Sequence, residues 1–97
     1  MRVRLHSFAL DDLDDGRRFY DRQLAGLGIR FLDSLFADIE ALLPSAGVHQ
    51  KVFGYHRALS RRFPYAIYYR LNGPDIEVVR VLDCRQHPVR TGKALEK

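Results

Sequence analysis

Apolar residues in the first half of the chain recur with the period of a helix. Five of them are three or four residues apart and fall along one helical side: Ala9, Leu13, Gly16, Tyr20 and Leu24. Ser7 stands where an N-cap would stand, and the carboxylates at positions 11, 12, 14 and 15 lie near the positive end of this helix. Similar spacing predicts a second helix from Ile29 to Leu43, ended by Pro44. Because Gly26-Leu27-Gly28 is a short connection, we expect an antiparallel helical hairpin.

The second half of the chain has the composition of short strands separated by turns. We predict strands over 57–62, 65–71 and 76–83, with Phe63-Pro64 and Asn72-Gly73-Pro74-Asp75 as the breaks between them. The last run is apolar on both faces except at Glu77 and Arg80, which favours a central place in the sheet. The alternation at positions 2–6 predicts a further strand at the N-terminus.

The middle strand is expected to turn one face to the helices. Side chains alternate along a strand, so one face carries Tyr65, Ile67, Tyr69 and Leu71. Tyr68 belongs to the opposite face, where its exposure would indicate a surface for stacking bases or a partner.

These elements predict one α+β domain. A short N-terminal strand and an antiparallel two-helix hairpin pack on a small antiparallel β-sheet over residues 1–90, and a basic tail follows over 91–97. No apolar run approaches the roughly 20 residues of a membrane span, and no signal-peptide pattern is present. The lone Cys84 has no disulfide partner in the chain, so the cytoplasm is the expected compartment.

Charge is divided unevenly between the two halves. Residues 1–43 carry six arginines against eight carboxylates, whereas residues 44–97 carry ten Lys or Arg against four. Thirteen of the sixteen cationic residues are arginine, whose planar fork pairs with phosphates and carboxylates at two points. The sheet half is therefore expected to meet nucleic acid or an acidic protein segment, unless these arginines only form solvated strand faces.

Candidate catalytic chemistry is sparse. His87 follows Arg85 by two residues, and imidazole can move protons near neutral pH, so a ribonuclease using Arg85, His87 and His56 is one hypothesis. The alternative is that His87, before Pro88, is an ordinary loop residue. His6 and His49 have no partner at a recognisable spacing, and no ligand pattern predicts a metal or another cofactor.

The order of several short motifs resembles one known family. These are ALDDLDDGRRFY over 9–20, Gly26-Leu27-Gly28 with Phe31-Leu32, then Arg57, FPYAIYYR over 63–70, and Val81 with Arg85-Gln86-His87-Pro88. Together they resemble the RelE/ParE superfamily of bacterial toxins from about residue 3 to residue 90. The resemblance implies the toxin of a type II toxin–antitoxin system, encoded beside a small antitoxin that silences it. RelE-like members cut messenger RNA on the ribosome, and ParE-like members poison DNA gyrase.

Departures from the RelE-like pattern favour the ParE-like branch and argue against an enzyme. Ala66 occupies the place of an expected arginine after Tyr65, although Arg85 matches a second one. The expected lysines are missing before the hairpin, and no tyrosine follows Tyr69. A nuclease needs a proton acceptor, a proton donor and cations, of which only cations are evident. A basic binding module without toxicity is the third hypothesis.

The resemblance also implies partners and contact residues. We expect a cognate antitoxin with an acidic C-terminal segment, held in a hetero-oligomer by Arg57, Arg61, Arg62 and Arg85. Contacts to the target, gyrase in the ParE-like reading, are assigned to Arg85, Arg90 and Lys93.

Overall fold

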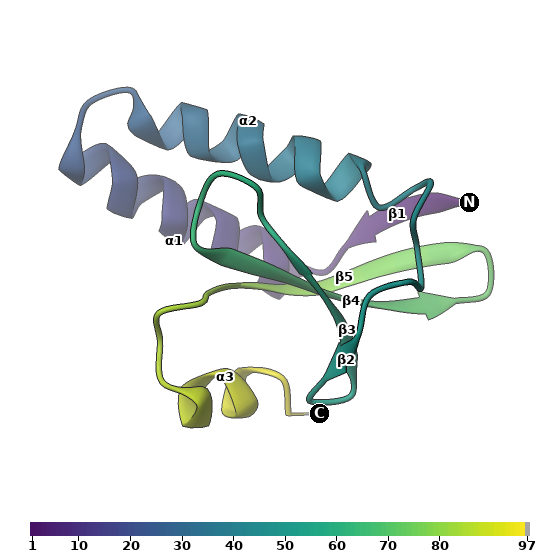
Figure 1. Ribbon diagram of the computed structural model, residues 1–97. Helices are drawn as coiled ribbons and strands as arrows, with labels where there is room; N and C mark the ends of the chain where they lie inside the picture. The colour runs from purple at the N-terminus through teal and green to yellow at the C-terminus, as the bar shows by residue number, and fades with distance from the viewer. Residues whose placement is uncertain (97) are drawn as a thin grey trace.

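The sheet separates two layers of helix. The computed structural model describes residues 1–96. Its elements follow the chain as β1 (Arg2–Leu5), α1 (Ser7–Gln23), α2 (Leu27–Glu40), β2 (Lys51–Val52), β3 (Tyr55–Leu59), β4 (Tyr65–Asn72), β5 (Asp75–Asp83) and α3 (Pro88–Ala94). The hairpin of α1 and α2 covers one face of the sheet, and α3 lies on the other side (Figure 1).

The five strands lie in the order β1-β5-β4-β3-β2. The pairings β2–β3, β3–β4 and β4–β5 are antiparallel, whereas β1 runs parallel to β5 with Val3 opposite Ile76. The predicted α+β class is confirmed, as is the interior position of β5. Its one buried carboxylate, Glu77, accepts a hydrogen bond of 2.7 Å from Arg70 Nε on β4.

The helix boundaries differ from those expected from the sequence. His6 is the N-cap of α1, so Ser7 is the first helical residue, and the first turn holds no carboxylate. The helix α2 begins at Leu27, after Gly26 has taken the left-handed conformation with φ of 86°. It ends at Glu40, and turns lead on past Pro44 to Gly47. The prediction of Ser7 as a cap and Pro44 as the stop was therefore wrong.

The main core lies between the helical hairpin and the sheet. Phe31 and Leu35 of α2 are fully buried in one cluster with Ile67 and Tyr69 of β4. The two helices approach closely at Gly16, where an added Cβ would lie 2.5 Å from Phe31 Cζ. Leu71, expected on this core face, is 44% exposed because it lies near the turn of the β4–β5 hairpin.

A second, smaller core covers the opposite face of the sheet. Tyr68 is only 4% exposed there, packed in one cluster with Ala66, Val79 and Leu82. Leu95, just after α3, completes this cluster. The expected boundary at residue 90 falls inside α3, which spans Pro88–Ala94.

The β2–β3 hairpin was not predicted. Its turn is made by Phe53 and Gly54, whose φ angles are 55° and 84°. The strand β3 therefore begins at Tyr55 and ends at Leu59, earlier than the predicted 57–62. Beyond Leu59 the chain leaves the strand because Asp38 of α2 binds both the Ser60 hydroxyl and the Arg61 amide.

Candidate functional site

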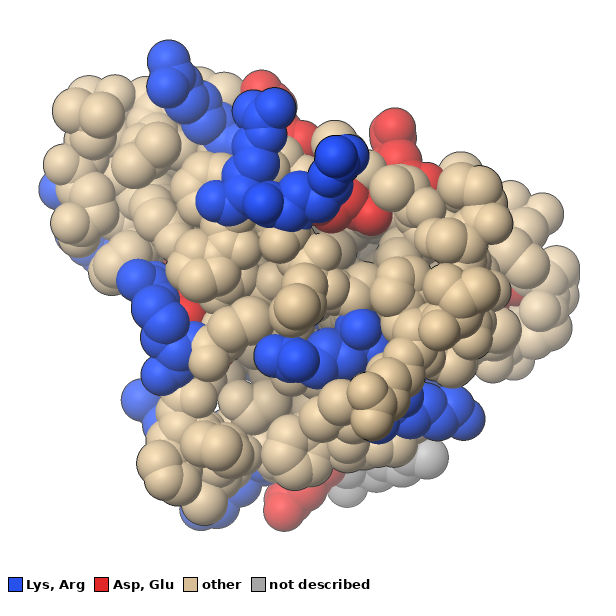
Figure 2. All heavy atoms as spheres, in the orientation of Figure 1, with Lys and Arg blue, Asp and Glu red and all other residues tan. Residues whose placement is uncertain are grey.

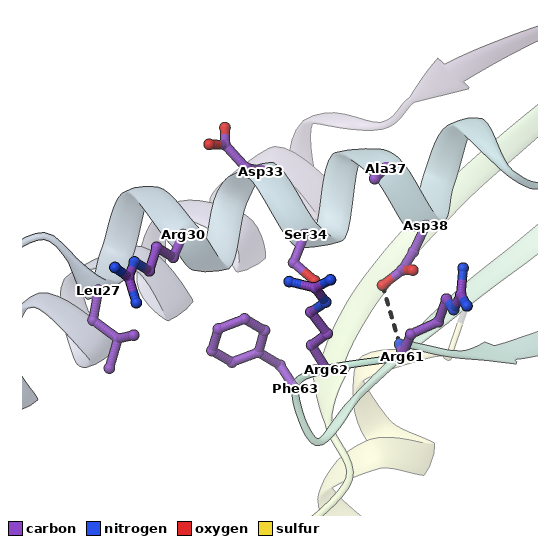
Figure 3. Close-up of a pocket in the computed structure, with 9 residues that line it drawn as sticks. All are labelled: Leu27, Arg30, Asp33, Ser34, Ala37, Asp38, Arg61, Arg62 and Phe63. Atoms are coloured by element: carbon purple, nitrogen blue, oxygen red, sulfur yellow. Dashed lines mark hydrogen bonds between the residues drawn. The ribbon is translucent and has the colours of Figure 1, made fainter.

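A groove lies between α2 and the segment 60–64 that joins β3 to β4 (Figure 3). Its volume is about 860 Å³. Three exposed arginines line it, Arg30 from α2 and Arg61 and Arg62 from the joining segment. Leu27 and Phe63 add an apolar part to its wall. We call this site the arginine groove.

Helical spacing forms one wall of the arginine groove, and hydrogen bonds to Asp38 hold the other wall in place. Leu27, Arg30, Ser34 and Asp38 are spaced by three or four residues, so they share one face of α2. On the other wall, Asp38 Oδ2 accepts hydrogen bonds from Ser60 Oγ at 2.7 Å and from the Arg61 amide at 3.2 Å. This carboxylate therefore holds the joining segment at a fixed place beside α2.

Phe63 anchors the same segment to the main core. Its ring makes edge-to-face contacts with Tyr20, at a centroid distance of 4.9 Å, and with Phe31, at 5.2 Å. Such aromatic pairs add about 0.5–1.5 kcal/mol beyond the burial of their area. Part of the Phe63 ring still reaches the groove, so this wall offers an apolar surface.

The arginine groove carries positive charge that the chain itself leaves largely uncompensated. Among residues 1–96, Arg30, Arg61 and Arg62 have no carboxylate within ion-pair distance, whereas Arg17 and Arg18 of α1 each pair with two. Asp38 already accepts two hydrogen bonds, and Asp33 points away from Arg62 and Phe63 (Figure 3). Figure 2 shows Lys and Arg side chains gathered over α2 and the β3–β4 connection.

Arg85 forms an ion pair with a carboxylate of the same chain. Its Nε and Nη2 donate to the two carboxylate oxygens of Asp83 at 2.9 and 2.7 Å, and its guanidinium lies 5.7 Å from the centre of the Phe19 ring. This hydrogen-bonded ion pair lowers the pKa of Asp83. Nearby, burial raises the pKa of Tyr65 to about 12, so its phenol stays protonated at neutral pH.

Arg57 lies apart from the arginine groove. Its Nε donates to the Tyr68 hydroxyl at 3.2 Å, on the face of the sheet that α3 covers, and its Nη2 lies 3.7 Å from Cys84 Sγ. The four arginines expected to contact an antitoxin are therefore divided. Arg61 and Arg62 line one groove, whereas Arg57 and Arg85 contact groups elsewhere in the chain.

The two histidines of the nuclease hypothesis, His56 and His87, lie on opposite sides of the sheet. His56 stacks on Tyr69 on the side of the helical hairpin, and its Nδ1 lies 2.6 Å from the carbonyl oxygen of His49. His87 caps α3 on the other side of the sheet, where its Nδ1 accepts from the Val89 amide at 3.1 Å. Arg90 and Lys93, expected to contact the target, are exposed residues of this same short helix.

Sequence reasoning missed two residues of the arginine groove and one contact between residues far apart in the chain. Arg30 and Asp38 could have been found from the shared helical face of positions 27, 30, 34 and 38, which has polar residues at three of its four places. No sequence signal pairs His49 with Tyr69, whose hydroxyl contacts His49 Nδ1 and accepts from the Gly47 amide at 3.0 Å. Only the fold brings that loop to the sheet.

Two further properties concern the described part of the chain. Over residues 1–96, no three His, Cys, Asp or Glu side chains come together in a way that could hold a metal ion. Within the same residues, no helix has the length and apolar character needed to cross a bilayer.

Comparison with solved structures finds the same fold in another protein. A structure described as "Chromosomal ParDE TA system from P. aeruginosa" superposes with a TM-score of 0.74, covering 84% of this chain and 92% of that chain at 19% sequence identity. The helical hairpin on a small sheet is therefore a fold that this chain shares with that structure. A comparison with curated proteins gave no match.

The family is established by sequence. Residues 3–88 match the model of the ParE toxin of the type II toxin-antitoxin system parDE. The chain therefore belongs to the ParE toxin family, and the resemblance noted from its motifs is confirmed.

Proposed function

We propose that this chain is a toxin that an antitoxin neutralises and that inhibits DNA gyrase, thereby stopping replication. The observation that carries the proposal is the match to the ParE toxin model over residues 3–88, joined to a site that is equipped for binding. The cytoplasm is the compartment in which such a protein would meet gyrase. Its antitoxin would form a hetero-oligomer with it.

The arrangement of side chains supports binding in preference to RNA cleavage. Ala66, at the place where the RelE-like pattern has an arginine, is 1% exposed beneath the segment that carries α3. Arg85 gives two of its N–H groups to Asp83, and His56 and His87 lie on opposite sides of the sheet. A cleavage site would need a proton acceptor, a proton donor and a cation around one phosphate.

The exposed cations of α3 are our candidate contacts to the target. Arg90 and Lys93 are three residues apart on this helix, so they lie on one side of it, and both are exposed. Arg85 precedes them but is held by Asp83. We therefore assign the larger share of the target contact to Arg90 and Lys93.

Induced expression in a bacterium tests the proposed function. DNA synthesis and translation would be followed within minutes of induction, and transcript ends would be mapped in the same cultures. We expect DNA synthesis to stop first while messenger RNA stays intact, and purified gyrase to accumulate cleaved DNA in the presence of the protein. Co-expression of the neighbouring gene should restore growth.

Two other outcomes would contradict the proposal in different ways. Early translation arrest with codon-phased cuts would indicate a RelE-like nuclease and return attention to Arg85, His87 and His56. Normal growth at a verified protein level would indicate a binding module without toxicity. A variant with Arg90 and Lys93 changed to Ser, compared with an Arg2→Ser/Arg22→Ser variant of equal net charge, would test the target contact.

A further inference from the structure

We propose that a hollow between the end of α3 and the sheet binds a small molecule that carries a carboxylate on an apolar body. The hollow has a volume of about 190 Å³, and α3, the strands β3 to β5 and the start of α1 all contribute to its wall. Tyr55 and Arg70 would hold the carboxylate, while Val79 and Leu95 would contact the apolar body. We call this site the Tyr55 hollow. It shares no lining residue with the arginine groove.

The hydroxyl of Tyr55 is available to a ligand. Tyr55 is only 9% exposed, and a buried tyrosine usually gives its O–H to a hydrogen-bond partner. The hydroxyls of Tyr68 and Tyr69 have such partners, whereas that of Tyr55 forms no hydrogen bond within residues 1–96. Every fully enclosed side-chain nitrogen or oxygen of the described residues has a partner, so the Tyr55 oxygen is not enclosed. It therefore faces the hollow that this side chain lines.

Arg70 brings an unused edge of its guanidinium to the same hollow. Its Nε donates to Glu77 Oε1 at 2.7 Å, which fixes the plane of the group. Its two Nη groups make no hydrogen bond within the described residues. The hydrogen bond to Glu77 raises the pKa of Arg70, and the neighbouring Tyr55 phenol, ionised where an arginine titrates, adds to that rise. Tyr55 and Arg70 therefore lie beside each other.

The free groups of this pair favour an acceptor as the ligand end. A guanidinium can only donate hydrogen bonds, and the Tyr55 O–H can donate one more. A carboxylate can accept from both Nη groups through its two oxygens and still accept from the hydroxyl. Arg80 also lines the hollow, but its nitrogens donate to Asp12 and to the Ala94 carbonyl oxygen. The carboxylate is therefore assigned to Tyr55 and Arg70.

The remaining wall suits a small apolar body. Val79 and Leu95 are 8% and 6% exposed, and the exposed Phe8 has its ring 5.6 Å from Arg80 Cζ. An apolar cavity of about 150 Å³ is large enough to bind benzene. Sites for drug-sized ligands measure roughly 300–1,000 Å³, so the Tyr55 hollow limits its ligand to one ring or a short branched chain.

Such a ligand would connect α3 to the sheet. Leu95 and Ala94 belong to the end of α3, whereas Tyr55 and Arg70 belong to β3 and β4. A molecule that binds only when these elements are together stabilises their contact. The same chemistry is offered by a free organic acid and by the C-terminal residue of a peptide, and the test separates these two sources.

The test titrates the full chain with 3-phenylpropionate and follows backbone amide signals by NMR. Its amide, 3-phenylpropanamide, is the control ligand, because it keeps the ring and loses the charge. The peptide Gly-Gly-Phe, with a free or an amidated C-terminus, represents a chain end. Tyr55→Phe is compared with Tyr68→Phe, which removes a hydroxyl outside the hollow that accepts from Arg57. Arg70→Lys and Glu96→Gln complete the set.

We expect 3-phenylpropionate to shift the signals of Tyr55, Arg70, Val79 and residues 94–96, and to slow amide exchange in residues 92–95. Tyr55→Phe should weaken binding about tenfold, while Tyr68→Phe stays within about twofold of wild type. Tyr55→Phe should leave the urea midpoint unchanged, because the hydroxyl has no partner to lose. A loss of binding would then not reflect unfolding.

Two charge changes should act in opposite directions. Arg70→Lys should weaken binding about fivefold, since one ammonium cannot pair with both oxygens. Glu96 is an exposed carboxylate of the lining that repels an anion, so Glu96→Gln should strengthen binding about twofold.

Several results would overturn the inference. Equal binding of the acid and its amide would show that no carboxylate is recognised, and wild-type affinity in Tyr55→Phe would remove the hydroxyl from the site. Signal shifts confined to residues 27–38 and 60–64 would place the ligand in the arginine groove. Tighter binding of Gly-Gly-Phe, lost on amidation, would support the site with a chain end as its ligand, and tighter binding of 3-phenylpropionate would support a free acid. Inhibition of gyrase is measured separately and does not depend on these outcomes.

Discussion

Asp12 of α1 and Arg80 of β5 form a two-point ion pair across the main interface between helix and sheet. Arg80 Nε and Nη2 donate to the two carboxylate oxygens of Asp12 at 2.7 and 2.8 Å, and the Val81 amide donates to Asp12 Oδ2 at 3.0 Å. Arg80 Nη1 also donates to the carbonyl oxygen of Ala94 at 3.1 Å. The pair therefore links α1, β5 and α3.

Replacing Asp12 by Ala should destabilise the protein by about 3 kcal/mol. The change leaves the Arg80 guanidinium without its carboxylate and removes the acceptor of the Val81 amide, both in a largely buried place. Urea denaturation would measure the loss. Asp15→Ala is the matched control, because Asp15 is exposed and should cost less than about 0.5 kcal/mol. Equal effects of the two changes would contradict the role assigned to Asp12.

Gly16→Ala should destabilise the hairpin of α1 and α2 although alanine favours helix. The new Cβ would lie 2.5 Å from Phe31 Cζ and 2.6 Å from Phe31 Cε2, so the packed ring must move at a cost of about 1–3 kcal/mol. Adding Phe31→Leu to the same chain should recover part of that loss, since the clashing ring atoms are gone. Strict additivity of the two changes in a double-mutant cycle would show that they do not meet.

Leu95 should contribute to folding even though it lies near the end of the chain. It is 6% exposed in the second core with Tyr68 and Leu82, so Leu95→Ala should lower the free energy of unfolding by about 2 kcal/mol. Val89→Ala is the control, because Val89 of α3 is 59% exposed and should cost less than about 0.5 kcal/mol. A null effect at Leu95 in chemical denaturation would mean that α3 is not docked in solution.

Tyr65 should make the protein sensitive to alkaline pH. Burial raises its pKa to about 12 in the folded state, above the value near 10 of an unfolded chain. Since the folded state holds this proton more tightly, its contribution to stability is complete below pH 10 and is lost as pH rises towards 12. Tyrosinate absorbance should show a late ionisation that Tyr65→Phe reduces, while Tyr20, whose pKa burial also raises, keeps a part of it. Ionisation of every tyrosine near pH 10, with the fold intact by circular dichroism, would refute this.

Local patterns were sufficient to predict the α+β class and the interior strand. The spacing of Ala9, Leu13 and Tyr20 indicates a helix because the burial of one side repeats every 3.6 residues. The apolar run at β5 indicates burial on both faces, and the structure has it between β1 and β4. Helix ends were predicted less well, because the capping of α1 by His6 depends on the path of the chain out of β1.

The sequence by itself determined the helical hairpin, the strands other than β2 and an excess of arginine in the sheet half, since periodicity, turn residues and charge are local properties of a chain. The tertiary structure alone decided which arginines have a carboxylate partner. Arg85 and Arg80 have carboxylates to bind, whereas Arg30, Arg61 and Arg62 line one groove without such partners among residues 1–96. Pairing of charges depends on distances between residues far apart in sequence, and only packing of α2 beside the β3–β4 connection sets those distances.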